Sequence, residues 1–206
     1  MPQGRLITIE GLDGAGKSTL GLGLYAALGE RGVRVELLRE PGGVALSEGI
    51  RGLVMDPGLT MDPRAEALLY AAARAQLVRE RLRPLLGAGA TVLLDRYVDS
   101  SLAYQGAGRE LGVEQVRELN RFATAGLEPD RTLLLRIDPA TGRARQAGRG
   151  GTADRLERED EAFFGRIADA YDELAAAEPD RFRVLDATLP PPRVLADAIG
   201  AIEDLL

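Results

Sequence analysis

The 206-residue chain contains no cysteine, no histidine and no tryptophan. Without cysteine it can form no disulfide and offers no thiol nucleophile. Without histidine it lacks the side chain that most often acts as a general base or a metal ligand near neutral pH. No apolar run approaches the roughly 18 residues that a membrane-spanning helix needs. Any catalytic site must therefore work without a thiol or an imidazole.

Lysine is almost absent as well, because Lys17 is the only lysine and every other basic residue is arginine. The net charge of −6 argues against nucleic acid as a partner, so an anionic ligand must be held by local arginine clusters. Residues 1–5 do not follow the charged-then-apolar plan of a signal peptide. We expect a cytoplasmic protein with no membrane partner.

Short apolar runs alternate with longer segments of helical periodicity. The predicted strands are residues 6–9, 33–38, 91–94, 132–137 and 182–185. The predicted helices are residues 17–31, 62–86, 113–125, 159–177 and 192–206. Strictly alternating strands and helices are typical of α/β proteins with a parallel sheet. We therefore predict one domain over residues 1–206, with a doubly wound five-stranded parallel sheet and helices on both faces.

Two features modify this pattern. Pro84 is expected to kink or end the long helix, because proline cannot donate the backbone hydrogen bond. Residues 142–152 are rich in glycine and arginine and have few apolar anchors, so we predict a mobile segment there. Its expected extent is about residues 142–153.

The strongest motif is EGLDGAGKST at residues 10–19, in which Gly11 to Ser18 fit G-x-x-x-x-G-K-[ST] between a predicted strand and a helix. This P-loop wraps phosphates in backbone N–H groups, with its lysine on the β- and γ-phosphates and its serine on Mg²⁺. A glycine-rich turn that caps a helix is the alternative. Arginine's planar fork would not enter such a loop as lysine does, which explains the single lysine. The predicted ATP-binding residues of the loop are Gly11, Leu12, Asp13, Gly14, Ala15, Gly16, Lys17, Ser18 and Thr19.

The loop carries no arginine, so a further positive charge on the transferred phosphoryl group must come from elsewhere. The candidates are Arg143, Arg145 and Arg149 in the glycine-arginine segment, although arginines there could simply be solvated. Asp95 and Arg96 follow a buried strand at the edge where α/β sheets bind ligands. Asp95 could hold Mg²⁺ and Arg96 could clamp a phosphate, or the two could form a surface ion pair.

Several further motifs have the order and spacing of one family. They are REPGG at 39–43, YAAARAQL at 70–77, DRY at 95–97, SSLAYQG at 100–106, DRLE at 154–157 and DAT at 186–188. Together with the P-loop, they make the chain resemble the bacterial thymidylate kinases over nearly its whole length. The resemblance implies a P-loop fold, ATP and dTMP as substrates, Mg²⁺ as cofactor, a homodimer, and residues 142–153 as the lid.

The resemblance also assigns roles to residues. Arg74 and Gln105 would read the thymine edge with Ser101 nearby, and Tyr70 would stack on the base. Tyr104 would lie against the deoxyribose, and Arg51 and Arg96 would hold the dTMP phosphate. Asp13 and Glu40 would lie near the sugar hydroxyl and the phosphates, while Pro41 and Ser100 complete the substrate site. The remaining implied residues are Arg149 as the catalytic lid arginine, with Arg143 and Asp186 on ATP.

The implied reaction gives ADP and dTDP from ATP and dTMP. The attacking phosphate oxygen is already ionised, so no general base is needed, and catalysis rests on positioning and charge from Lys17, Asp13, Arg96, Arg149 and Mg²⁺. A P-loop kinase of another nucleoside monophosphate is the alternative within this class. A GTPase switch is disfavoured, because its N-K-x-D motif would need a second lysine.

Overall fold

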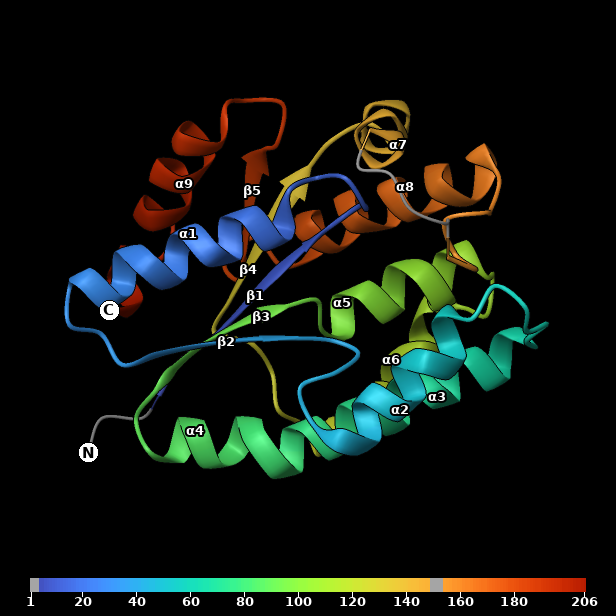
Figure 1. Ribbon diagram of the computed structural model, residues 1–206, viewed down its shortest axis with the longest axis horizontal. Helices are drawn as coiled ribbons and strands as arrows, with labels where there is room; N and C mark the ends of the chain where they lie inside the picture. The colour runs from blue at the N-terminus through green and yellow to red at the C-terminus, as the bar shows by residue number, and fades with distance from the viewer. Residues whose placement is uncertain (1–3, 149–153) are drawn as a thin grey trace.

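The computed structural model describes residues 4–148 and 154–206, and its centre is a five-stranded parallel sheet. The strand order is β2-β3-β1-β4-β5, so β1 lies in the middle (Figure 1). The strands are β1 (Leu6–Gly11), β2 (Val35–Arg39), β3 (Thr91–Asp95), β4 (Arg131–Arg136) and β5 (Phe182–Asp186). All five predicted strands are confirmed, with ends that shift by one or two residues.

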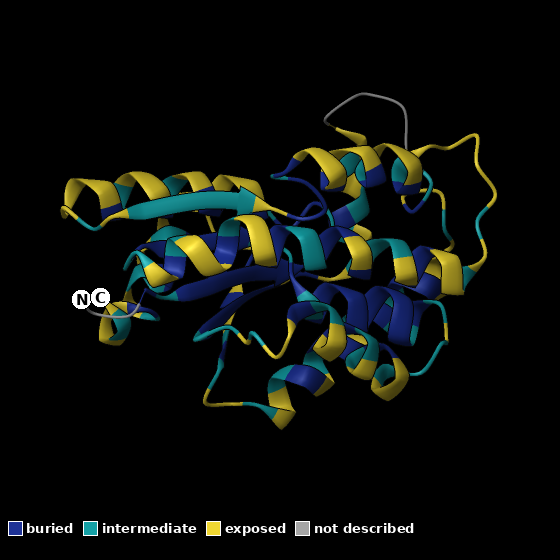
Figure 2. Cartoon of the chain, turned by 90° about the horizontal axis from the view of Figure 1, so that it is seen from below, coloured by how far each residue is buried: buried dark blue, intermediate teal, exposed yellow. Residues whose placement is uncertain are grey.

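Side-chain alternation along the strands explains why helices cover both faces of the sheet. Ile7 and Ile9 pack in one cluster with leucines of α1 (Lys17–Glu30), whereas Leu6 packs with residues of α4 (Arg83–Gly87) on the opposite face. Helix α9 (Pro191–Gly200) lies beside α1. Helix α5 (Val98–Ser101) contacts β1, and α8 (Glu161–Ala177) contacts β5. Figure 2 shows the buried residues concentrated in the central strands and the inner helix faces.

A second layer of helices extends beyond the sheet. It contains α2 (Ala45–Met55), α3 (Pro63–Leu77) and α6 (Val113–Thr124), and both α2 and α6 pack against α3. A π-helical segment, η2 (Leu102–Gly108), continues α5 and packs against α6 and α8. The α5–η2 segment was not among the predicted helices, because its glycines and polar residues hide its periodicity.

The long predicted helix is continuous from Pro63 to Gly87, so Pro84 does not end it. The chain passes from α3 through one π-helical stretch, η1 (Val78–Leu82), and then into α4, where Pro84 stands at the first turn. A proline is tolerated at the start of a helix because the N–H group there needs no intrahelical acceptor. The change of hydrogen-bond register just before Pro84 therefore allows the helix to pass through it.

Part of the glycine-arginine segment is helical. Helix α7 (Pro139–Ala147) includes residues 142–147, which belong to the segment predicted to be mobile. Asp138 caps this helix, because its side chain accepts a hydrogen bond from the Thr141 N–H, and Pro139 occupies the first position. The D-P-x-T sequence is thus a start signal that outweighs the glycine content. The rest of the predicted lid, residues 149–153, lies outside the described residues.

The last predicted helix is shorter than expected, since α9 stops at Gly200 and only a short 3₁₀ turn, η3 (Glu203–Leu205), follows it. In the part of the chain that the structure describes, no helix combines the length and apolarity needed to cross a membrane.

Candidate active site

The P-loop connects the central strand β1 to α1 and is held from both sides. A Cβ atom on Gly11 would lie 2.5 Å from the Leu135 carbonyl oxygen of β4. A Cβ on Gly14, whose φ is +84°, would lie 2.2 Å from the carbonyl oxygen of Gly142 in α7. Side chains at these positions would push the loop away from both neighbours. Helix α1 starts with no side-chain cap, which leaves its first N–H groups for an anionic ligand.

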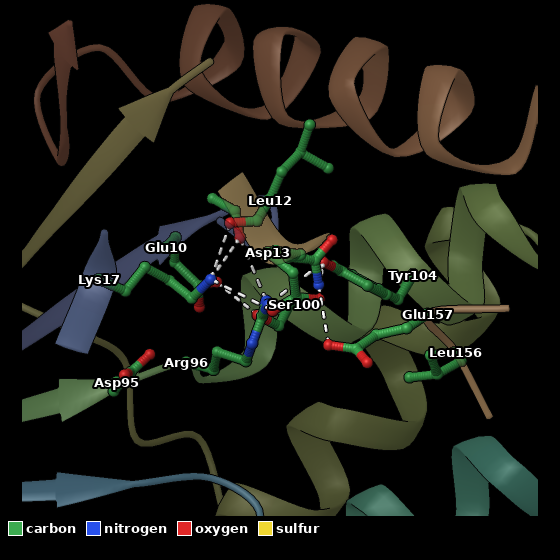
Figure 3. Close-up of polar contacts among 12 residues, drawn as sticks. Glu10, Leu12, Asp13, Lys17, Asp95, Arg96, Ser100, Tyr104, Leu156 and Glu157 are labelled. Atoms are coloured by element: carbon green, nitrogen blue, oxygen red, sulfur yellow. Dashed lines mark hydrogen bonds and ion pairs between the residues drawn. The ribbon is translucent and has the colours of Figure 1, made fainter. Parts of the chain in front are cut away.

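Lys17 lies under the loop with 7% of its surface exposed. Its Nζ donates to the carbonyl oxygens of Gly11 at 3.1 Å and Leu12 at 2.9 Å, and it stands 3.7 Å from the Asp13 carboxylate (Figure 3). Burial and the nearby Arg96 lower the pKa of Lys17 to about 8, although Asp13 opposes the shift. The ammonium is therefore held close to the loop in a setting where an additional negative charge would stabilise its protonated form.

Arg96 approaches the same loop from the end of β3. Its guanidinium donates to Asp13 at 2.5 Å, to Ser100 at 3.0 Å and to the Tyr104 hydroxyl at 3.2 Å. Burial alone would lower the pKa of Arg96, but Asp13 raises it well above its usual value. Burial likewise opposes ionisation of Asp13, yet Arg96 and Lys17 together lower the pKa of that carboxyl. Two cations thus share one carboxylate at the phosphate end of the site.

A cleft of about 350 Å³ opens beside these groups. Four arginines line it, and Arg39, Arg51 and Arg96 stand there beside the buried Arg74, which suits an anionic ligand. The remaining predicted residues that line it are Asp13, Gly14, Gly16, Lys17, Ser18, Thr19, Glu40, Pro41, Tyr70, Asp95, Ser100, Ser101, Tyr104 and Gln105. The sequence prediction missed Arg39 as a lining residue, along with Met55, Asp154 and Leu156. The motifs REPGG and DRLE contain three of these four, but give no indication of where their side chains lie.

Arg74 is 2% exposed, and its contacts engage the whole guanidinium. Nε donates to Glu40 at 2.7 Å, Nη1 to Ser101 at 2.9 Å and to Asn120, and Nη2 to the Tyr97 carbonyl oxygen at 2.8 Å. Nη2 also lies 2.6 Å from the Glu40 carboxylate. A ligand that hydrogen-bonds Arg74 must therefore replace one of these partners.

Glu40 lies buried in the cleft wall with one oxygen free. Burial raises the pKa of Glu40, and the ion pair with Arg74 opposes the shift only in part. Its Oε1 atom has no hydrogen-bond partner among the described residues. Leaving a buried acceptor unpaired costs about 1–3 kcal/mol, so this oxygen is suited to a donor on a ligand. A sugar hydroxyl would supply one.

Several predicted ATP-binding residues lie away from the cleft. Arg143 on α7 pairs with Glu161 at 3.2 Å. Arg149, the predicted catalytic lid arginine, lies outside the described residues. Asp186, at the end of β5, accepts hydrogen bonds from the Thr188 N–H and hydroxyl. Arg145 donates to the Ala187 carbonyl oxygen at 2.8 Å and so ties α7 to this turn. Gly11, Leu12 and Ala15 belong to the loop itself and are buried.

The chemistry of the Ser18 and Asp95 side chains suits Mg²⁺. The Ser18 hydroxyl donates to an Asp95 oxygen at 2.9 Å, so two hard oxygen ligands stand together beside the P-loop. No group of three or more acidic residues that could hold a metal occurs within residues 4–148 and 154–206. One or two protein ligands together with phosphate oxygens and water is the usual arrangement for Mg²⁺ in phosphoryl-transfer sites.

The parallel sheet, the P-loop and the arginine-lined cleft define a P-loop nucleotide kinase. The family model described as thymidylate kinase matches residues 9–199. A thymidylate kinase of Deinococcus radiodurans is 50% identical over 99% of this chain and 98% of its own length. One from Lactobacillus delbrueckii is 46% identical over 98% of this chain and 96% of its own length.

A solved structure extends the comparison. The crystal structure of thymidylate kinase from Ehrlichia chaffeensis superposes with a TM-score of 0.80 at 28% identity, covering 98% of this chain and 99% of that one. With a family match of this extent, the chain belongs to the thymidylate kinase family. The predicted fold class and family are thereby confirmed.

Proposed function

We propose that this chain transfers the γ-phosphoryl group of ATP to dTMP, giving ADP and dTDP, inside the cell where both substrates are made and used. The observation that carries this proposal is the arrangement of Lys17, Asp13 and Arg96 where the P-loop meets the cleft. A donor phosphate on Lys17 and an acceptor phosphate on Arg96 would meet there. Family membership supplies the substrates, because the curated relatives are thymidylate kinases.

The acceptor would fill the cleft from the P-loop to its far wall. Tyr70 would offer its ring to the base, and Ser101 and Gln105 would bind the polar edge together with Arg74, which exchanges one internal partner for the base. Gln105 now donates to the buried Glu66 at 2.7 Å, so its amide is held at the cleft wall. Tyr104 and the free Glu40 oxygen would lie along the sugar, while Arg51 and Arg96 bind the phosphate.

The chain's own residues would act on the phosphates without a general base. Lys17 and Arg96 hold the two phosphoryl groups in line, and Asp13 fixes the relative position of these cations. Ser18 and Asp95 would hold Mg²⁺, which when bound neutralises charge on the donor phosphates. A lid arginine, of which Arg149 is our candidate, and Arg143 and Asp186 around ATP complete the proposal.

A coupled ADP-release assay with ATP and Mg²⁺ tests the function. The acceptors dTMP, dUMP, CMP, GMP, AMP and thymidine are supplied in parallel. Strong preference for dTMP is the expected result. Preference for another monophosphate would keep the P-loop and refute the assignment of Arg74, Ser101 and Gln105. Absence of transfer to every acceptor would overturn the kinase assignment itself.

We also propose that the chain forms a homodimer through its second helical layer. Each of its helices carries exposed apolar side chains: Leu46 on α2 is 54% exposed and Leu53 49%, Leu68 on α3 is 57% exposed and Phe122 on α6 87%. Covering these side chains would remove a sizeable apolar area from water.

The change Phe122→Glu is therefore expected to weaken the dimer, because it puts a charge in place of the most exposed apolar side chain of this layer. Sedimentation velocity across a dilution series measures the shift toward monomer. The matched control is Leu22→Glu on α1, which is 63% exposed but lies on the opposite side of the sheet. An unchanged mass for the Phe122 variant at every concentration would refute this interface.

A further inference from the structure

Glu10 has no part in the mechanism described above, yet it is a fully buried carboxylate next to the P-loop. It is 0% exposed and is the residue of β1 just before Gly11. Its Oε1 accepts from the Tyr97 N–H at 2.7 Å. Its Oε2 accepts from the Ser100 hydroxyl at 2.6 Å and the Tyr171 hydroxyl at 2.9 Å. Both oxygens are thus occupied by donors from other elements.

The first of these contacts fixes an unusual turn. Arg96 has a φ of +70°, in the left-handed region that residues with a side chain seldom adopt. The N–H of Arg96 donates to the Ile9 carbonyl oxygen at 3.0 Å, and the next N–H, of Tyr97, donates to Glu10. Two neighbouring residues of β1 therefore hold the turn on both sides of the left-handed residue. This turn aims the Arg96 side chain back over the P-loop (Figure 3).

The second contact reaches the guanidinium itself. Ser100 donates its only hydroxyl proton to Glu10, so its oxygen is left to accept from Arg96 Nη1 at 3.0 Å. The Glu10 carboxylate therefore sets the orientation of the Ser100 hydroxyl, and the hydroxyl sets one of the directions of the guanidinium. Tyr171 from α8 lies 3.1 Å from Ser100 and closes the arrangement.

We propose that Glu10 is a positioning residue for phosphoryl transfer: its two oxygens fix the left-handed turn at Arg96 and, through Ser100, the direction of the guanidinium. The inference rests on the proposed function, in which Arg96 binds the acceptor phosphate. It adds a residue that touches no substrate and that acts through Arg96.

The surroundings of Glu10 give this role a dependence on pH. The charged and titratable groups facing it are Asp99 on α5, Arg96 after β3, Lys17 on α1 and Tyr171 on α8. Burial and the Asp99 charge raise the pKa of Glu10 to about 7, although Ser100, Arg96 and Tyr97 oppose the shift. Below this pH the Glu10 carboxyl is protonated and therefore uncharged, as the amide of a glutamine at this position would be.

The test compares Glu10→Gln with wild type by steady-state kinetics between about pH 6 and about pH 8.5. At the high end, kcat/KM for dTMP is expected to fall about 10- to 100-fold, because a small misplacement of a phosphate-binding group has an effect of that order. The KM for ATP is expected to stay within about twofold. The two pH profiles should converge toward pH 6, where wild-type Glu10 is itself protonated. The ionisation of dTMP affects both proteins equally and cancels in their ratio.

Matched variants separate positioning from stability. Asp99→Asn removes another buried carboxylate, one that binds Arg181 and Thr132 rather than Arg96. This variant should have a lower melting temperature and keep kcat/KM for dTMP within about twofold of wild type at high pH. Because the Asp99 charge raises the pKa of Glu10, the variant's pH profile should approach that of Glu10→Gln only at a lower pH than the wild-type profile does. If Glu10→Gln fails to fold, Tyr171→Phe decides: removing one donor should lower kcat/KM for dTMP about two- to fivefold with the KM for ATP unchanged.

The outcomes that overturn the inference are distinct from failure of the proposed function. An inactive wild-type protein would refute the function. An active wild type with unaltered dTMP kinetics in Glu10→Gln, or in Tyr171→Phe where that variant decides, would refute the positioning role. A loss that is equal at every pH and equally large for ATP would make Glu10 a structural residue only.

Discussion

Lys17→Met is expected to fold normally and to lose at least about 100-fold in kcat, because it removes a preorganised charge from the transferred phosphoryl group. The methionine side chain keeps the unbranched stem that lies under the loop. The two carbonyl oxygens that Lys17 contacts keep other donors, since Arg96 donates to Gly11 and the Ala15 N–H to Leu12. Rapid-quench measurement of ADP formation at saturating ATP and dTMP gives the loss, and thermal unfolding verifies the fold.

The matched control is Lys17→Arg, which keeps the charge and changes its shape. The ammonium fits between the carbonyl oxygens of Gly11 and Leu12, 3.1 and 2.9 Å away, and a planar guanidinium would not fit there in the same way. We therefore expect this variant to lose most of its turnover as well. Near-normal turnover in Lys17→Met would contradict the P-loop assignment. Near-normal turnover in Lys17→Arg alone would show that charge suffices and shape does not matter.

Arg96→Ala and Arg96→Gly should both lose about 10²- to 10³-fold in kcat/KM for dTMP, because both remove the guanidinium from the cleft. Their stabilities should differ. Alanine at a φ of +70° carries the strain of a left-handed residue, roughly 1–2 kcal/mol, whereas glycine adopts this conformation readily. Urea unfolding measures the difference in the free energy of unfolding, and initial rates measure the kinetics.

The pair of Arg96 variants separates side chain from backbone. Equal kinetic losses with a more stable glycine variant would assign the effect to the guanidinium. Retained activity in Arg96→Gly would instead assign it to the backbone turn, and the phosphate-clamp role would be wrong. Removing Arg96 also removes a cation that lowers the pKa of Lys17, so that pKa should rise in both variants.

The local patterns of the chain were sufficient to predict the sheet and the phosphate loop. Parallel strands buried on both faces read as short apolar runs, and all five were found within one or two residues of their ends. The P-loop is a contiguous motif: its glycines set the backbone conformation and its lysine supplies the charge, and all of these residues are neighbours in the sequence. Local signals were less informative where glycine and proline were present, as the continuous helix through Pro84 and the helix at Pro139–Ala147 demonstrate.

The cleft could be predicted only by resemblance, because its residues come from distant parts of the chain. A sequence motif does not show which residues of the other motifs its side chains will contact in the folded chain. Arg74 and Asn120 are 46 positions apart, and Glu10 and Tyr171 are 161 apart, yet each pair forms a buried hydrogen bond. The family motifs identified Arg74 as a site residue but not the five contacts that hold it, and they did not identify Arg39 as a cleft residue.

The sequence by itself thus determined the alternation of strands and helices, the P-loop and the restriction of its lysine to one position. These depend on backbone conformation and side-chain shape over a few neighbouring residues. Only the tertiary structure decided that Lys17 and Arg96 share Asp13, that Glu40 keeps a free oxygen, and that Glu10 lies behind Arg96. Burial and the distances between charges set these features, and both arise only when strands far apart in the sequence are packed into one sheet.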